Sequence, residues 1–222
     1  MPFTWSRPGA TKKGAEPPPT GDAGSREHLV CKGLYQVLEK VFLEPKPEVL
    51  NLGPLCGDTV AYLGGKGSRV HIGEFTPPRP MPEREAGKPP PSPEPVHLPY
   101  DDEAFHLVLA WDLVDFVPPE CLPAFGSELR RILKPGGRLF LFSQANQART
   151  SPGPARKEVF DTPGRFRILD PSHVRLEKVT DENRRRRWVH PNRDLERAMK
   201  GMSILGIHLL RNQLREFTAV RT

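Results

Sequence analysis

Long apolar runs are absent from this chain of 222 residues. No stretch reaches the about 18 consecutive apolar residues that a membrane-spanning helix needs. The first residues hold proline, lysine and glycine where a secretory signal peptide would have an apolar core. These two absences predict a cytoplasmic protein that does not insert into a membrane.

Residue sets for metal binding and for nucleophilic catalysis are missing as well. The three cysteines, Cys31, Cys56 and Cys121, lack the spacing of metal ligands, so we expect reduced, buried thiols. The seven histidines are scattered along the chain, and no Ser-His-Asp arrangement is apparent. The sequence therefore predicts no metal site.

Basic residues moderately exceed acidic ones, which gives a formal charge of +6. The sharpest basic run is Arg184–Arg187, followed by Trp188. Arginines can lie along phosphates while a tryptophan stacks on bases, which would suit a nucleic-acid partner. Such a run is more often a solvated strand edge or loop, so nucleic acid is not the expected partner.

Proline is abundant, with 27 residues, and its distribution suggests one domain with loops and a tail. Residues 1–26 offer no apolar face and are expected to form a disordered tail, followed by a single domain at 27–222. Within that domain, residues 76–95 hold nine prolines. Helices and central strands reject proline at that density, so we expect an irregular loop. Residues 145–190 are interpreted as an insertion.

Apolar periodicity and turn residues place the regular elements. Strands alternate with helices, which favours a doubly wound α/β fold with its ligand site at the carboxyl ends of the strands. The expected elements are a helix at 27–43, a strand at 48–52, a helix from 58, strands at 69–75 and 104–111, a helix at 118–133 that stops at Gly136 and Gly137, short strands at 166–169, 174–179 and 186–189, a helix at 192–202, and a hairpin of strands at 204–210 and 215–220.

The stretch from Val49 to Asp58 is typical of a nucleotide cradle. An apolar strand pattern stops at Gly53, a second glycine follows at Gly57, and a helical pattern begins near Asp58. Glycine lets a ligand approach the main chain, and the start of a helix presents free N–H groups and a positive dipole end. The spacing is not the GxGxxG of dinucleotide enzymes.

Two further stretches carry a family resemblance, Leu98–Asp112 (LPYDDEAFHLVLAWD) and Glu128–Ser143 (ELRRILKPGGRLFLFS). Together with the glycine stretch they resemble the class I S-adenosylmethionine (SAM)-dependent methyltransferases, in particular small bacterial members of the type 11 group. The resemblance spans about residues 47–144 well and 192–222 more loosely. It implies a Rossmann-like sheet with a C-terminal antiparallel hairpin. The proline-rich segment implies a reduced second crossover, with the third strand surviving at most as a short piece at 96–98.

The resemblance also implies which residues hold SAM. Glu74, at the end of the second strand, corresponds to the acidic residue that binds the ribose. Asp112, at the tip of the fourth strand, is the expected catalytic residue and also meets the cofactor. The full set of expected cofactor-binding residues is Asn51, Gly53, Pro54, Cys56, Gly57, Glu74, His97, Leu98, Trp111 and Asp112.

Several positions depart from the family pattern, which makes the chain partly degenerate. Asn51 replaces an acid that helps to orient the SAM amino group, and His106 replaces an aspartate that is usually structural. Asp115-Phe116 stands in place of a Glu-His pair, so no acid–base role can be transferred from that pair. The Asn-Pro-Pro-Tyr motif of amino-methylating nucleic-acid enzymes is absent.

We therefore expect a SAM-dependent methyltransferase whose acceptor, a small molecule or a protein, is unknown. One alternative is a degenerate methyltransferase-fold protein that acts as a binding or scaffold subunit without catalysis. The other is an RNA-associated protein that uses Arg184–Arg187.

Overall fold

A computed structural model describes residues 26–82, 92–145, 160–177 and 185–222 of the chain. The expected tail at 1–26 and the middle of the proline-rich segment therefore lie almost wholly outside the described residues. Within the described ranges, no helix is long and apolar enough to cross a membrane.

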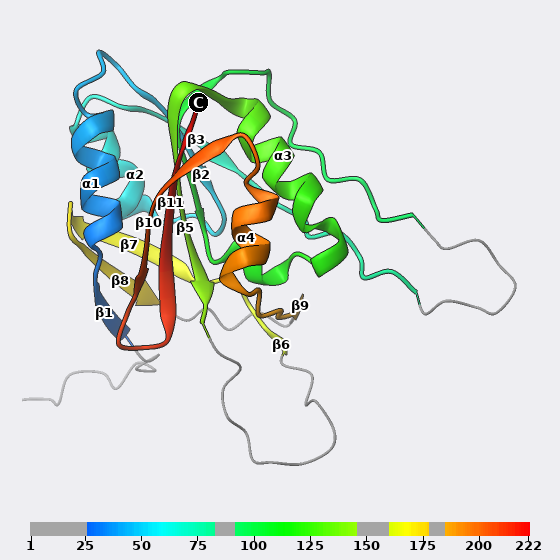
Figure 1. Cartoon of the computed structure of the whole chain (residues 1–222). Helices are drawn as coiled ribbons and strands as arrows, with labels where there is room; N and C mark the ends of the chain where they lie inside the picture. Colours follow the sequence, from blue (N-terminus) through cyan, green and yellow to red (C-terminus); the bar gives the residue numbers. More distant parts are fainter. Residues whose placement is uncertain (1–25, 83–91, 146–159, 178–184) are drawn as a thin grey trace, which may run out of the picture.

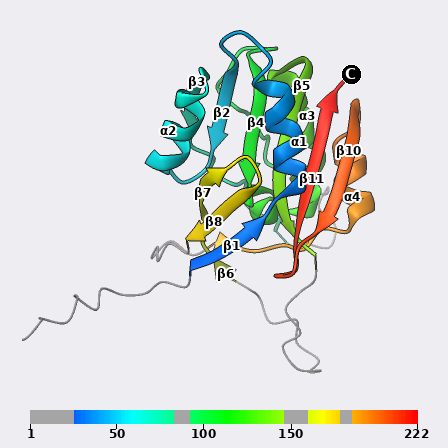
Figure 2. The same cartoon turned by 90° about the vertical axis from the view of Figure 1, so that its left-hand side faces the viewer.

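A six-stranded sheet forms the centre of the molecule (Figures 1 and 2). Its spatial order is β10-β11-β5-β4-β2-β3. The first four strands in chain order, which pair in parallel, are β2 (Glu48–Leu52), β3 (Arg69–Gly73), β4 (Phe105–Trp111) and β5 (Leu133–Gln144). The last two, β10 (Met202–Leu209) and β11 (Leu214–Arg221), add an antiparallel hairpin to β5.

Helices cover both faces of this sheet, so the α/β class expected from the sequence is confirmed (Figure 1). Two of them, α1 (Lys32–Val41) and α2 (Gly57–Gly65), pack on one face. The other face carries α3 (Leu122–Ile132) and α4 (Asn192–Ala198), and two short 3-10 turns, η1 (Leu113–Phe116) and η2 (Pro119–Cys121), precede α3. Strand β4 is almost wholly buried between the two layers, as its apolar sequence requires.

The helix expected at 27–43 is wrong in its first turn. Residues Arg26–Val30 form strand β1, which pairs antiparallel with β8 (His173–Glu177) of the insertion. The helix begins only at Lys32, after Cys31, whose N–H donates to Ser172 O at 2.7 Å. Pairing with the insertion thus makes Arg26–Val30 a strand, although the apolar spacing from Glu27 onward is helical.

The glycine pair at the start of β5 does not stop a helix, which is a second correction. Helix α3 ends at Ile132, and Leu133 already pairs with Phe105. The next paired residue of β5 is Arg138, so residues 134–137 leave the ladder as an irregularity, with Gly136 at φ +77.

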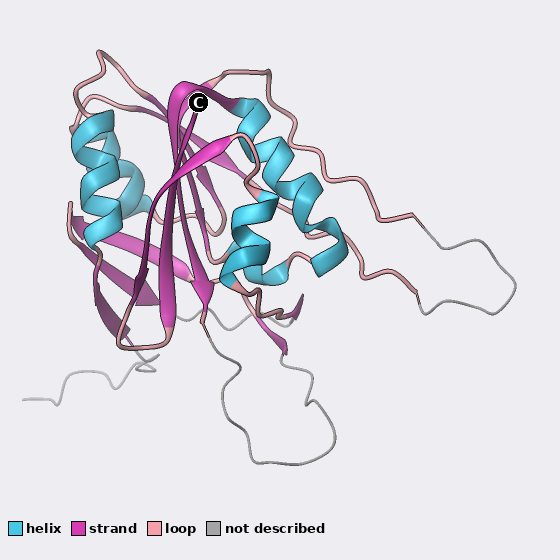
Figure 3. Ribbon diagram, in the orientation of Figure 1, coloured by secondary structure: helices cyan, strands magenta, loops and turns pink. Residues whose placement is uncertain are grey.

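No strand lies between β3 and β4 among the described residues, so the short strand considered for 96–98 is not formed (Figure 3). Residues 74–82 and 92–98 are irregular, as their prolines predict. Strand β3 is consequently one edge of the central sheet.

The insertion builds two small antiparallel sheets near the carboxyl ends of the parallel strands. Strand β7 (Arg165–Asp170) completes a three-stranded sheet with β8 and β1, and it packs against α2. The Thr59 hydroxyl joins the two elements, because it donates to Phe166 O and accepts from Ile168 N–H. Strand β6 (Phe160–Asp161) pairs with β9 (Arg185–Arg186), which is shorter than the strand expected at 186–189.

Helix α1 begins without a side-chain cap of its own. The fully buried Glu216 carboxylate of β11 supplies the cap, since it accepts Gly33 N–H at 3.1 Å and Leu34 N–H at 3.4 Å. An acidic group at a helix N-terminus satisfies free N–H donors and matches the positive end of the dipole.

The close approach of α3 to α4 depends on Gly126. A β-carbon on Gly126 would lie 2.1 Å from Ala198 O, a backbone atom. We expect Gly126→Ala to lower the free energy of unfolding by about 1 to 3 kcal/mol or more, because two backbones must separate. Gly64→Ala is the matched control: it lies inside α2, its β-carbon would meet nothing within 4 Å, and alanine should stabilise it by up to about 1 kcal/mol. Urea denaturation measures both, and equal effects would contradict the prediction.

Candidate functional site

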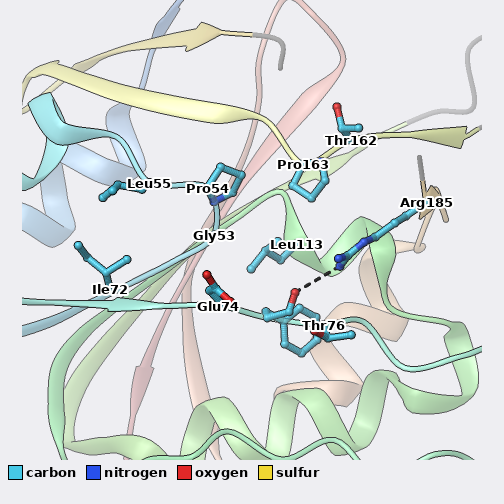
Figure 4. Close-up of a pocket in the computed structure, with 11 residues that line it drawn as sticks. Gly53, Pro54, Leu55, Ile72, Glu74, Thr76, Leu113, Thr162, Pro163 and Arg185 are labelled. Carbon is cyan, nitrogen blue, oxygen red and sulfur yellow. Dashed lines mark hydrogen bonds between the residues drawn. The ribbon is translucent and has the colours of Figure 1, made fainter. Parts of the chain in front are cut away.

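A cavity of about 300 Å³ opens at the carboxyl ends of β2, β3 and β4 (Figure 4). This volume lies at the lower limit of typical small-molecule sites, about 300 to 1,000 Å³. Its walls come from the loop after β2, the end of β3, the turn after β4, and the insertion. The lining residues are Gly53, Pro54, Leu55, Ile72, Glu74, Phe75, Thr76, Leu113, Thr162, Pro163 and Arg185.

Gly53 forms the base of the turn after β2. Its φ of +137 lies in a region that side chains rarely adopt, so glycine is required for the conformation itself. Its N–H donates to Gly73 O at 3.1 Å, which ties the turn to the end of β3. Glu74 follows directly and lines the same cavity, so the glycine turn and the expected ribose-binding acid lie together.

Asn51 and Trp111 face each other on the side of the sheet that α1 and α2 cover. The indole Nε1–H of Trp111 donates to Asn51 Oδ1 at 2.8 Å, and both residues are about 1 % exposed. The Trp111 ring stacks on Phe166 of the insertion, with centroids 5.0 Å apart and an interplanar angle of 6°. Neither Asn51 nor Trp111 lines the cavity, and the buried Asn51 Nδ2 has no hydrogen-bond partner among the residues that the structure describes.

Asp112 is buried beside a second, smaller cavity of about 130 Å³. Its carboxylate accepts the Gly164 N–H at 3.0 and 3.2 Å, and Arg187 lies 3.8 Å away. Thr162 lines both cavities, so the turn Thr162–Gly164 lies between them. Asp112 thus adjoins the first cavity without lining it.

Arg187 gathers three carboxylates around one guanidinium. It lies 3.2 Å from Asp115 and 2.8 Å from Asp161, in addition to its longer contact with Asp112. Asp115 is fully buried and also accepts the Ser143 hydroxyl and the Gln144 N–H. The sequence analysis transferred no acid–base role to Asp115 and did not predict this cluster.

Burial raises the pKa of both aspartates, and Arg187 opposes that rise. The pKa of Asp112 is raised to about 7 and that of Asp115 to about 6. Desolvation penalises the charged carboxylate, whereas the nearby guanidinium favours it. Asp112 can therefore take up or release a proton near neutral pH.

The remaining expected site residues divide between the cavity and the core. Pro54 lines the cavity, but Cys56 is buried at the start of α2 and Gly57 has open space where a β-carbon would lie. His97 pairs with Glu128 at 3.3 Å, and Leu98 is buried in the core. The cavity therefore combines Gly53, Pro54 and Glu74 of the expected set. A cofactor role stays a prediction for every residue of that set.

Sequence reasoning missed eight of the cavity residues, and the insertion supplies three of these, Thr162, Pro163 and Arg185. Only the arginine run gave a signal, and it was interpreted as a surface feature. Among the described residues, no group of three histidine, cysteine or acidic side chains could hold a metal ion.

Several solved structures are similar to this chain. A SAM-dependent methyltransferase from Methanosarcina mazei matches with a TM-score of 0.49 and 13% identity, over 83% of this chain and 96% of that one. A protein from Pyrococcus horikoshii matches with a TM-score of 0.44 and 16% identity, over 86% and 89%. The Burkholderia thailandensis 1,6-didemethyltoxoflavin-N1-methyltransferase, solved with S-adenosylhomocysteine, matches with a TM-score of 0.44 and 14% identity, over 86% and 79%. No curated protein matches.

The family described as "Methyltransferase domain" matches residues 50–141, from β2 to β5. These residues therefore form a methyltransferase domain, as the class I SAM-dependent methyltransferase motifs of the sequence predict. The family resemblance seen in the sequence is therefore confirmed, and SAM is the cofactor of this methyltransferase domain. The cavity lies within the matched stretch on the Gly53 and Glu74 side and is completed by the insertion outside it.

The raised aspartate pKa values predict a stability that depends on pH. In the folded methyltransferase domain Asp112 keeps its proton at pH values where the unfolded chain, with carboxyl pKa values of about 4, has lost it. Protonation then favours the folded state, so this group lowers the free energy of unfolding as the pH rises from about 4 to about 7.

Asp112→Asn should remove that contribution. The free energy of unfolding should then fall less steeply with pH, by at most about 1.4 kcal/mol per pH unit. Urea denaturation of parent and variant between about pH 5 and about pH 8 measures the difference. Asp101→Asn, at an exposed position, is the control. Parallel profiles for the parent and Asp112→Asn would contradict the prediction.

Proposed function

We propose that this protein is a SAM-dependent methyltransferase that holds the nucleoside part of SAM in the cavity beside Gly53 and Glu74. The proposal rests on one observation above all: the glycine turn and the acid that follows β3 line one cavity within the matched methyltransferase stretch. SAM, when bound, supplies a methyl group on a positively charged sulfur.

The residues of the cavity fit a nucleoside. The Glu74 carboxylate is a strong acceptor for two vicinal ribose hydroxyls. The backbone at Gly53 lets a ligand approach closely, because no side chain intervenes. Leu113 and Phe75 add apolar surface to the same cavity, as a flat base requires.

The second cavity is the proposed acceptor site. It adjoins the first through Thr162, and it contains the Asp112 carboxyl, whose pKa near 7 lets it accept a proton that an acceptor loses. Methyl transfer requires mainly alignment and exclusion of water, so Asp112 is proposed as the single acid–base group. This cavity, about 130 Å³, is smaller than typical small-molecule sites, so it suits a small acceptor group, carried by a small molecule or by a protein side chain.

A binding or scaffold protein with the methyltransferase fold is the second candidate, because one observation favours it. Asn51, where the family pattern has an acid that orients the SAM amino group, is already engaged by Trp111 and is buried. Nucleic acid is not among the proposed partners, because Arg187 of the basic run pairs with carboxylates inside the fold. Arg184 of the same run lies outside the described residues. Location in the cytoplasm remains a proposal from the sequence.

Calorimetric titration with S-adenosylhomocysteine tests the cofactor site. Glu74→Ala should weaken binding by about 1.5 to 3 kcal/mol, roughly ten- to a hundredfold, the usual loss of a hydrogen bond to a charged group. Glu196→Ala, on the exposed face of α4, is the control. A parent protein that does not bind the ligand at millimolar concentration would leave the scaffold as the better candidate.

A pair of alanine substitutions tests the glycine turn. Gly53→Ala should abolish measurable binding, because alanine cannot readily adopt a φ of +137. Gly57→Ala should retain binding, because its β-carbon would meet nothing within 4 Å. Titration with S-adenosylhomocysteine measures both, and equal losses would show that the turn is not part of the site.

Asp112→Asn tests the proposed acid–base role. Asparagine keeps a side-chain oxygen for the Gly164 N–H but cannot accept a proton. We expect binding of S-adenosylhomocysteine to be preserved and transfer of a radiolabelled methyl group to a cell extract to fall by about 10²- to 10⁴-fold. Full transfer by the variant would remove Asp112 from the mechanism.

A further inference from the structure

Among the described residues that line the main cavity, Arg185 is the one cation, on the wall that the insertion provides (Figure 4). Strand β9 carries it across the cavity from Gly53 and Glu74, and its side chain is half-buried. Its one hydrogen bond to a described residue runs from Nη1 to Phe75 O at 3.3 Å. A guanidinium has five N–H donors, so most of them have no partner within the described ranges and face a cavity that can hold a ligand.

Arg187, two residues further along, has a structural role and serves as a comparison for Arg185. Three carboxylates surround it, and its side chain is 16 % exposed. Arg185 has no ion pair with any described carboxylate, although Glu74 lines the same cavity. The two arginines of one short segment therefore differ in kind: Arg187 is neutralised within the fold, whereas Arg185 lines the cavity without an ion pair to any carboxylate in the described part of the chain.

We propose that Arg185 binds an oxyanion, a carboxylate or a phosphate, of the ligand that occupies this cavity. The cavity has an acceptor carboxylate, that of Glu74, on one wall and the guanidinium N–H donors of Arg185 on the opposite wall. It therefore matches a ligand with hydroxyl donors at one position and an anionic group at another. This inference rests on the proposed function and adds a residue from the insertion to the ligand site.

The anionic group has two sources under the proposed function. It is either the carboxylate at the amino-acid end of the cofactor or an anionic group of the methyl acceptor. Both would be bound by the same charge-assisted hydrogen bonds, which are stronger than neutral ones. Ligands with and without the amino-acid carboxylate separate the two.

The first arm compares S-adenosylhomocysteine with 5′-methylthioadenosine, which has the same nucleoside but no carboxylate. Calorimetry gives the affinity of both ligands for the parent, Arg185→Gln and Arg185→Lys. If the cofactor supplies the anion, Arg185→Gln should weaken S-adenosylhomocysteine at least about tenfold and leave 5′-methylthioadenosine unchanged. Arg185→Lys keeps the charge but loses the planar, forked set of N–H donors. Its affinity for S-adenosylhomocysteine should lie between those of the parent and Arg185→Gln.

The second arm uses inorganic phosphate as the anion. The parent, saturated with 5′-methylthioadenosine, is titrated with phosphate at constant ionic strength, and so is Arg185→Gln. If the acceptor supplies the anion, phosphate should stabilise the parent against heat but not the variant. Arg193→Gln, whose side chain is 80% exposed on α4, is the matched control in both arms and should behave as the parent.

Two results would overturn the inference. Equal weakening of both nucleosides by Arg185→Gln would show that the arginine only holds the Phe75 segment in place. Unchanged affinity for both, with phosphate binding that does not depend on Arg185, would show that it binds no anion. If the parent binds neither nucleoside, the proposed function fails instead; the phosphate titration of the protein alone then still decides whether Arg185 is an anion site.

Discussion

The buried ion cluster around Arg187 is the interaction on which the site depends. Its three carboxylates come from the end of β4, from η1 and from β6, so one guanidinium fixes the insertion to the central sheet. Removing the cation would leave two buried carboxylates uncompensated, which typically costs about 3 to 5 kcal/mol. The cluster fixes the insertion in place, and that placement closes the cavity on the Thr162–Pro163 side.

The insertion also changes what the carboxyl edge of the sheet offers to a ligand. Phe166 stacks on Trp111, and Trp111 in turn donates to Asn51 Oδ1, so this part of the edge is packed. The open part lies over Gly53, Glu74 and Leu113, where polar and apolar walls meet. Packed core and open cavity thus occupy neighbouring halves of one edge, and Asp112 lies at their boundary.

The sequence predicted the central sheet and the glycine turn because both depend on local patterns. Strand β4 is apolar along its whole length, and Gly53 follows a strand and precedes a helix. Strand β1 could not be predicted, because its helical apolar spacing is overridden by pairing with a strand far along the chain. Arg185 and Arg187 look identical in the sequence, and only the positions of three distant aspartates distinguish the buried one from the one in the cavity.

The N-terminal elements take their stabilising partners from the far end of the chain. Strand β1 pairs with β8, and the first turn of α1 is capped by Glu216 of β11. During synthesis both elements emerge before these partners. Closing such long loops is entropically costly and slow, so β1 and the first turn of α1 lack these contacts until β8 and β11 have been made. Pairing of β1 and capping of α1 are therefore late steps in the folding of this protein.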